Sequence, residues 1–303
     1  MVSKRLKSII NKINKIKLTN INLKSLKSKV DDSIKVLKVF KNWYTFFLDR
    51  FGVYEKVRRE EVIYVLRNGL NFIARTKALD RWVIFEMFSE NPYSMISPKV
   101  GDIVVDIGAH IGTFSLWACK MMKGKGRIYA YEPDPYNFQL LKKNIQINKP
   151  LSKIIVAYNK AICKNRGKRR FYIWERDGVL VSYKSSLYPL FNENVIKTVE
   201  VDCITLEDIF KFNKINKINL LKMDCEGCEW EVILNTPPYY LKKIEKICLE
   251  YHWNSSMCYT VKDVIDLLSD LGFKVYIRRL PNKALPEYGI LYGYNQFFRR
   301  VSP

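Results

Sequence analysis

From residue 60 onward, the apolar positions of the chain follow two alternating patterns. Residues 61–76, EVIYVLRNGLNFIART, carry two runs of alternating apolar residues on either side of Asn68-Gly69, the strongest short-range signal for a β-hairpin. Residues 79–88 have the spacing of a helix. Short apolar runs of strand length then alternate with helical segments almost to the end of the chain. This alternation predicts a doubly wound, mainly parallel α/β sheet.

The individual elements can be placed by the same criteria. Strands are expected within 97–110 and at 127–134, 153–162, 198–203, 218–227, 246–253, 273–279 and 293–300. Helices are expected at 135–148, 205–212, 228–235 and 261–272. No helical pattern separates the last two strands, so we expect them to form an antiparallel hairpin at one edge of the sheet.

The first 59 residues differ in charge from the rest, and we predict a basic helical arm here, followed by one domain over 60–303. Residues 1–30 hold nine Lys and Arg and no acid, with apolar residues at helical spacing. Such a segment suits packing on its own domain or on another subunit, peripheral contact with an anionic membrane through residues 1–40, or a phosphate backbone. Within the domain, residues 60–95 form the hairpin and helix that lead into the core.

Composition narrows the class of protein. The chain has 303 residues, of which 48% are hydrophobic and 27% charged, as expected of an ordinary folded protein, but its net charge of +22 is unusual. Because no apolar run is long enough to span a bilayer and no signal-peptide pattern follows the start, we expect a cytoplasmic protein, with the membrane periphery as the alternative location. The odd number of cysteines, seven, scattered through expected strands and helices, predicts reduced, buried thiols.

Polar residues gather where the expected strands end. In a doubly wound sheet, ligands bind beyond the carboxyl ends of the strands. The residues that this rule collects are Asp106, Gly108, His110, Gly112, Glu132, Pro133, Asp134, Asn159, Asp224, Glu226, Glu229, Glu250, Tyr251 and His252. The chain has only two histidines, and both belong to this set. We therefore predict a functional site at this edge.

The turn after the first core strand, VVDIGAHIGTFSL (104–116), indicates the ligand. Gly108 and Gly112 would let the backbone approach a ligand closely, and Glu132 is placed to accept hydrogen bonds from the hydroxyls of a ribose. The spacing is not that of a dinucleotide fingerprint, and no Lys or Arg lies in the turn to hold a phosphate. A nucleoside with a cationic tail fits better, and S-adenosylmethionine is such a ligand.

These segments resemble the FkbM-type methyltransferases, which use S-adenosylmethionine and have a Rossmann-like, seven-stranded sheet. The resemblance covers roughly residues 60–300 and is carried by VVDIGAHIGTFSL, YEPDPYNFQLLKKNIQIN (131–148), NKAI (159–162), LKMDCEGCEWEVI (221–233) and CLEYH (248–252). It implies methyl transfer to oxygen, often to a hydroxyl of a sugar. It also implies that Asp106, Gly108 and Gly112 flank the methionine part of the cofactor, that Glu132 holds the ribose, and that Asn159 lies near the adenine. We add His110 and Asp224 to the cofactor-binding residues.

Several of these residues have a structural alternative. Asp134 is expected to cap the helix at 135–148, and Asp224 and Glu226 are placed to cap the helix at 228–235. Glu229 has the position of an outward helix face. Cys225 and Cys228 have the spacing of metal ligands, but without a second pair we expect small buried thiols and no metal. His252 could equally be a structural histidine beside Glu250.

Methyl transfer to a hydroxyl benefits from a general base. His252 is the first choice because its ordinary pKa lies near neutrality, with Asp224 and Glu226 as alternatives. The carboxylates could instead hold Mg²⁺, although the spacing does not require it. The aromatic segment 171–191, with Trp174, Tyr183 and Tyr188, is placed to enclose the acceptor. The predicted acceptor is a sugar, glycan or glycolipid; an RNA methyltransferase and a non-catalytic cofactor-binding protein are the rival functions.

Overall fold

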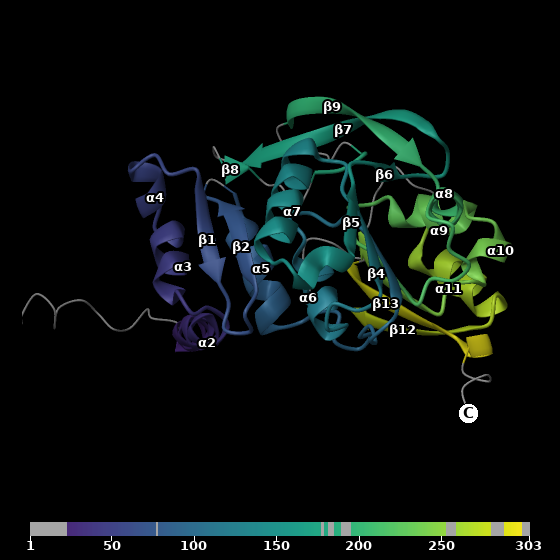
Figure 1. Ribbon diagram of the computed structural model, residues 1–303, viewed down its shortest axis with the longest axis horizontal. Helices are drawn as coiled ribbons and strands as arrows, with labels where there is room; N and C mark the ends of the chain where they lie inside the picture. The colour runs from purple at the N-terminus through teal and green to yellow at the C-terminus, as the bar shows by residue number, and fades with distance from the viewer. Residues whose placement is uncertain are drawn as a thin grey trace, which may run out of the picture.

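A seven-stranded sheet runs through the molecule, with the strand order β12-β13-β11-β10-β3-β4-β5 (Figure 1). The structure is a computed structural model that describes residues 23–76, 78–176, 179–180, 185–188, 195–252, 259–279 and 288–298. The strands are β3 (Ile103–Ile107), β4 (Arg127–Tyr131), β5 (Ile155–Tyr158), β10 (Leu220–Met223), β11 (Lys246–His252), β12 (Phe273–Arg279) and β13 (Tyr288–Asn295). Only β13 runs antiparallel to its neighbours. The predicted fold class and the antiparallel edge pair are confirmed.

Helices cover both faces of this sheet. One face packs on α8 (Leu206–Phe212), α9 (Glu229–Asn235), α10 (Pro238–Leu241) and α11 (Val261–Asp270). The other packs on α5 (Asp80–Ser89), α6 (Thr113–Met121) and α7 (Pro135–Ile147). Val104 and Val105, neighbours on β3, belong to opposite apolar clusters. A strand buried on both faces explains why the central strands are nearly continuous apolar runs.

The N-terminal elements extend the second of these layers. They are α2 (Leu23–Val39), α3 (Trp43–Arg50), α4 (Val53–Lys56) and the hairpin β1 (Glu61–Val65) and β2 (Asn71–Arg75), which pair antiparallel. The hairpin predicted around Asn68-Gly69 is therefore confirmed. Val36, Phe40 and Phe46 share one buried cluster with Val104 of the central sheet. The described residues on both sides of residue 60 thus contribute to the same core, whereas the predicted stripe within residues 1–22 lies outside the described residues.

A second, four-stranded sheet lies above the main one in Figure 1, with the order β6-β9-β7-β8. Its strands are β6 (Ala161–Ile162), β7 (Gly167–Arg176), β8 (Val179–Leu180) and β9 (Val195–Ile204). The expectation of one continuous strand over 153–162 is wrong: the 3₁₀ turn η2 (Leu151–Ile154) precedes β5, and β6 leaves the main sheet to pair with β9. The strand predicted at 198–203 lies within β9 and belongs to this second sheet.

The last strand also lies elsewhere than predicted. We expected residues 293–300, but β13 ends at Asn295 and is followed by the 3₁₀ turn η4 (Gln296–Phe298). The side-chain amide of Asn295 donates to the carbonyls of Lys242 and Ile244, and its oxygen accepts from the N–H of Phe297. These bonds turn the chain away from the ladder. Among the helices of the described ranges, none is both long enough and apolar enough to cross a membrane.

Candidate active site

A cavity of about 560 Å³ opens at the carboxyl ends of β3, β4, β10 and β11. The chain proceeds from β3 outward through β4 and then returns to β10 on the other side of β3, so the cavity lies where the winding direction reverses. The residues predicted at this edge that line it are Gly108, His110, Glu132, Pro133, Asp224, Glu226, Glu250 and His252. Asp106, Gly112 and Asn159, also predicted to hold the cofactor, are not among its described lining residues.

The glycines of the turn are required by the protein itself. Gly108 has φ +74°, and a Cβ there would lie 1.8 Å from the carbonyl oxygen of Asp224. Gly112 has φ +93°, and its Cβ would lie 2.7 Å from a methyl carbon of Leu141. Gly108 itself lines the cavity, so its predicted role in letting a ligand approach the backbone stays a prediction. The structure adds a second reason for each glycine: Gly108 lets the loops after β3 and β10 touch, and Gly112 lets α6 begin against α7.

Asp106 is buried beneath the cavity and not exposed to it. Its Oδ1 lies 3.1 Å from the Nζ of Lys222, and its Oδ2 accepts a hydrogen bond of 2.6 Å from the hydroxyl of Ser115. Lys222 itself lines the cavity and donates to the carbonyl of Gly108 at 2.8 Å. Burial alone would lower the pKa of Lys222, but Asp106 and Asp224 hold it above its ordinary value.

The sequence analysis did not identify Lys222 as a site residue. Lys222 lies within a buried strand, LLKM, and such an apolar run was interpreted only as part of the core. That position is itself a usable signal: a lysine inside a central strand must have a buried partner. Here, the partner is the acid at the end of the neighbouring strand, since β3 and β10 are paired with Lys222 opposite Asp106. The pair fixes the base of the turn that borders the cavity.

Glu132 follows β4 and reaches the cavity wall. Its carboxylate accepts backbone hydrogen bonds from His110 at 2.6 Å and Asp134 at 3.0 Å. Burial and the neighbouring Asp134 raise its pKa to about 8. Asp134 caps α7, as predicted, by accepting from the N–H groups of Tyr136 and Asn137. Glu132 thus joins the turn after β3 to the start of α7 and offers a carboxylate to a ligand.

Asn159 acts on the loop that carries Glu132. Its side-chain amide donates to the carbonyls of Glu132 at 2.8 Å and Pro133 at 2.9 Å. Asn159 is therefore a positioning residue for that loop.

His110 occupies the left-handed region, with φ +51°, at the edge of the cavity. Its Nε2 lies 3.7 Å from the buried carboxylate of Asp80, yet burial lowers its pKa to about 4. The histidine in the turn is therefore neutral near pH 7.

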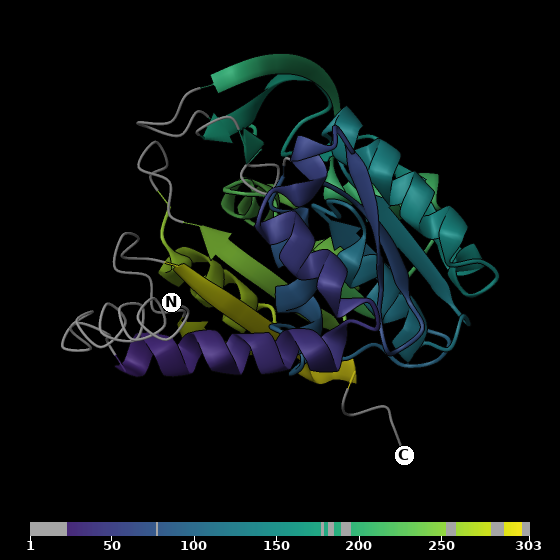
Figure 2. The same cartoon turned by 90° about the vertical axis from the view of Figure 1, so that its left-hand side faces the viewer.

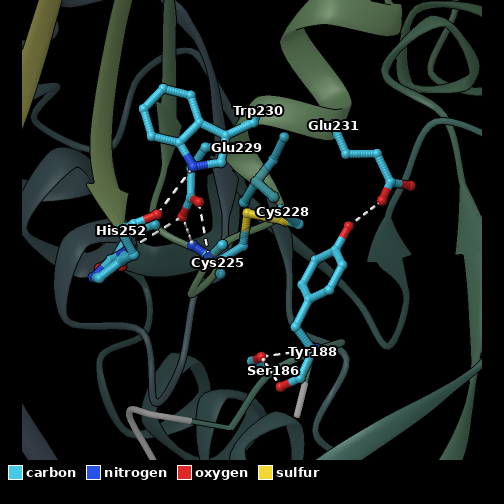
Figure 3. The surroundings of a disulfide bond; sticks show 12 residues. Ser186, Tyr188, Cys225, Cys228, Glu229, Trp230, Glu231 and His252 are labelled. Carbon is cyan, nitrogen blue, oxygen red and sulfur yellow. Dashed lines mark hydrogen bonds and ion pairs between the residues drawn. A yellow bond between two sulfur atoms is a disulfide. The ribbon is translucent and has the colours of Figure 1, made fainter. Parts of the chain in front are cut away.

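The loop after β10 is held in place by hydrogen bonds to the side chain of Glu229. Glu229, fully buried, accepts from the N–H of Cys225 at 2.7 Å and from the N–H of Gly227 at 2.8 Å (Figure 3). The expectation that Glu229 lies on an outward helix face is wrong, because both of its oxygens satisfy the loop's backbone. Asp224 and Glu226 do not cap α9; its N-cap residue is Cys228, without a side-chain cap. Glu226 has φ +54°, a conformation that these internal bonds hold in place.

Cys225 and Cys228 form a disulfide in this loop, which corrects the expectation of reduced thiols at these two positions. Figure 3 shows the bond beside Glu229 and Trp230, and the indole N–H of Trp230 donates to the carbonyl of His252 at 2.9 Å. Among the described residues, Cys119, Cys163, Cys203 and Cys248 are free and buried, as predicted, whereas Cys258 lies outside the described residues. Cys225 also lines the cavity, so the disulfide ties the acidic loop directly to α9.

His252 is surrounded by carboxylates. Its Nδ1 lies 3.5 Å from Glu229, and its Nε2 lies 3.7 Å from Glu226 and 3.9 Å from Glu250. Burial alone would lower the pKa of His252, but Glu226 and Glu229 raise it well above 6.5. The ordinary pKa near neutrality, on which the choice of His252 as the base rested, therefore does not apply in this environment, and a protonated imidazole cannot accept a proton. Burial in turn raises the pKa of Glu226 to about 8.

Two tyrosines complete this wall and were not singled out in the sequence. The hydroxyl of Tyr93 lies 3.3 Å from Asp224 and 3.2 Å from Glu250, and that of Tyr288 lies 2.6 Å from Glu250. Both come from segments far along the chain from the acidic loop, so no local pattern marks them. Of the aromatic segment 171–191, Phe171 and Ser185 line the cavity, whereas Trp174 is buried in the core, Tyr188 contacts Glu231, and Tyr183 lies outside the described residues.

Among the described residues, one group of side chains has the arrangement of metal ligands, but one of its members is already used to hold the loop. Asp224, Glu229 and His252 each offer one ligand atom, and these atoms lie within 4.8 Å of one another. Both oxygens of Glu229 already accept backbone hydrogen bonds, so binding a cation there would compete with the loop's own structure. The sequence expectation that no metal is required stays a prediction.

Comparison with known proteins gives a consistent result. The model of the FkbM methyltransferase domain family matches residues 106–275. A methyltransferase named sdnD from Sordaria araneosa is 25% identical over 230 residues, which are 68% of this chain and 86% of that protein. The 31-O-demethyl-FK506 methyltransferase FkbM from Streptomyces tacrolimicus is 24% identical over 250 residues, or 73% and 93%. Among solved structures, the methyltransferase FkbM from Methylobacillus flagellatus KT aligns over 71% of this chain and 53% of its own, with 16% identity and a TM-score of 0.44.

Proposed function

Because the chain belongs to the FkbM methyltransferase family, we propose that it transfers a methyl group from S-adenosylmethionine to a hydroxyl oxygen of a sugar, glycan or glycolipid. The observation that carries the proposal is the composition of the cavity wall. Five carboxyl groups line it, from Glu86, Glu132, Asp224, Glu226 and Glu250, against two cationic side chains, Lys222 and the protonated His252. A wall of this kind favours a ligand that carries positive charge and donates hydrogen bonds.

S-adenosylmethionine, the cofactor of this family, fits this wall. It supplies a methyl group on a positively charged sulfur, and it also carries an ammonium group and two ribose hydroxyls. Glu132 would accept hydrogen bonds from the ribose hydroxyls, and Asp224 would attract the cationic part. Lys222 and Asp106 keep the turn between them in place. The cavity volume lies in the range of small-molecule sites.

We propose Asp224 as the group that removes the acceptor's proton. Its side chain is 29% exposed, more than those of Glu226 at 17% and Glu250 at 15%, so it is the most open of the three to an acceptor. A hydroxyl is a weak nucleophile until its proton is removed, and a carboxylate within reach can take it. Glu226 would orient the acceptor, and the positive charge of His252, 3.7 Å away, would favour the ionised form of Glu226 against the effect of burial.

The experiment is transfer of radiolabelled methyl groups to separate pools of glycans, glycolipids and RNA, with Asp224→Asn as the control protein. Label in a base-stable, sugar-bound form is expected in the glycan or glycolipid pool and is expected to disappear with the variant. Label confined to RNA would replace the proposed acceptor class. Binding of the cofactor without transfer to any pool would favour the non-catalytic alternative.

A further inference from the structure

Helix α3 buries two polar side chains and one apolar side chain against the rest of the molecule. Its buried residues are Thr45, Phe46 and Asp49. Asp49 accepts a hydrogen bond of 2.6 Å from the hydroxyl of Tyr64 and lies 3.5 Å from Arg81. The ring of Phe46 packs edge-on against Trp82 of α5 at 5.4 Å. These contacts fix the rotation of α3 about its axis, because a buried carboxylate would be destabilising without its partners.

The same rotation directs large apolar side chains into solvent. Tyr44, Leu48 and Phe51 recur at helical spacing and are 55%, 36% and 70% exposed. Beside them, Trp43 is 42% exposed and Val57, just after α4, is 66% exposed. Figures 1 and 2 show α3 and α4 on the outer side of the molecule, away from the main sheet. Single exposed apolar residues are common, but a run of aromatic residues on one short helix pair marks an interaction surface.

We call this surface the α3–α4 face and define it by Trp43, Tyr44, Leu48, Phe51 and Val57. The stretch of chain that carries it is rich in exposed positive charge. Between residues 38 and 59, one carboxylate, Glu55, is exposed, because Asp49 is buried. The exposed cations of the same stretch are Lys38, Lys41, Arg50, Lys56, Arg58 and Arg59. Two copies of such a face would repel each other across a symmetric interface.

We propose that the α3–α4 face docks on an anionic lipid bilayer. Trp and Tyr favour the level of the headgroups, where their apolar rings are buried and their polar groups stay hydrated. Leu48 and Phe51 enter the upper acyl region, and the lysines and arginines meet the lipid phosphates. The residues that define this surface do not include any of residues 1–22, and the proposal does not depend on which acceptor is methylated. The helix that carries it also lies close to the cavity, because Trp82, against which Phe46 of α3 packs, lines the cavity.

The test uses the full chain and vesicles of phosphatidylcholine, with or without phosphatidylglycerol. The triple variant Tyr44→Ser, Leu48→Ser, Phe51→Ser is expected to lose about tenfold or more of its binding to the anionic vesicles. The matched control is Phe212→Ser, Tyr239→Ser, two aromatic residues that are 58% and 63% exposed on other helices. It should bind as the unaltered protein does. With brominated lipids, quenching of tryptophan fluorescence should decrease in Trp43→Phe.

Several results would overturn the proposal. Equal vesicle binding by the triple variant and the unaltered protein would show that the face is not the docking surface. Loss of a dimer in the triple variant would identify a second copy as the occupant. A marked fall in its melting temperature would mean that the face is covered within the chain itself. Binding that is equal with and without phosphatidylglycerol would exclude the anionic lipid.

Discussion

Lys222 and Asp106 form a buried ion pair between neighbouring parallel strands, with Nζ and Oδ1 3.1 Å apart. The lysine side chain is 4% exposed and the aspartate side chain is not exposed. The same ammonium group holds the carbonyl of Gly108, so the pair joins two strand ends and the glycine turn. The pair provides the stable base on which the cavity-lining residues of the turn rest.

Removing one partner of this pair should destabilise the fold. Lys222→Met leaves Asp106 buried without its cation, and we expect a loss of about 3–5 kcal/mol in the free energy of unfolding. Urea denaturation measures it. The double variant Lys222→Met, Asp106→Asn should regain part of the loss, because no buried charge then remains unpaired. Equal losses in the single and double variants would show that the charge pairing contributes little.

Glu132 should contribute directly to cofactor affinity. Glu132→Ala removes the proposed acceptor for the ribose hydroxyls. Above about pH 8, where Glu132 is ionised, we expect binding of S-adenosylmethionine to weaken by at least ~1.5–3 kcal/mol, the scale of a hydrogen bond to a charged group. Titration calorimetry measures the change, with circular dichroism to establish that the variant is folded. Unchanged affinity would place the ribose elsewhere.

The raised pKa of Glu132 also predicts a pH dependence of stability. Its pKa rises from 4.5 to about 8 on folding, so the folded protein binds this proton more tightly than the unfolded chain. The resulting contribution to stability is complete below about pH 4.5 and is lost as the pH rises through about 8. Denaturation midpoints from about pH 6 to about pH 9 should therefore fall less steeply in Glu132→Gln than in the unaltered protein. Parallel profiles would contradict the assignment.

The general base can be identified by turnover. Asp224→Asn should reduce the turnover number by about 10²-fold or more, the usual contribution of a general base. His252→Gln should keep measurable turnover but shift the pH–rate profile to higher pH, since Glu226 loses the positive charge that favours its ionised form. If His252→Gln is inactive at every pH while Asp224→Asn is active, the histidine is the base after all.

The disulfide predicts a specific peptide mass. Trypsin cleavage after Lys222 and Lys242 releases residues 223–242 with both Cys225 and Cys228. Alkylation of the denatured protein without a reductant should leave this peptide unmodified, and alkylation after reduction should add two labels. Two labels without prior reduction, in protein purified without reductants, would show that the loop carries free thiols.

The sequence predicts the main sheet well because both of its faces are buried. Each central strand must then be a short apolar run, and each crossover must be a helix, so the pattern repeats along the chain. The small sheet is harder to predict, since β7 and β9 pair across a long insertion. The end of β13 depends on one side chain, Asn295, whose partners Lys242 and Ile244 are distant in sequence.

For the functional site as well, the sequence predicts the features that depend on local position and not those that depend on distant residues. The rule that ligands bind at strand ends predicts Glu132, Asp224, Glu226 and His252 at the cavity, and all four line it. What the sequence cannot supply is the electrostatic environment of His252, because the pKa depends on three carboxylates that only the fold brings within 4 Å. Asp106 and Asn159 were also predicted at the site but do not line the cavity. A position at the end of a strand predicts that a residue is near the site, but it does not predict the direction of the side chain.

Residues 1–22 should add to membrane binding without being needed for the fold. Removal of residues 1–40 would expose the core, because Val36 and Phe40 are 2% and 0% exposed. Removal of residues 1–22 takes away six of the nine basic residues within residues 1–30 and none of the buried residues named above. We expect the shortened chain to keep its melting temperature and cofactor affinity and to bind anionic vesicles less tightly, with a weaker dependence on salt. Vesicle sedimentation at two salt concentrations measures this. An unchanged salt dependence would show that the first 22 residues take no part in contact with lipid.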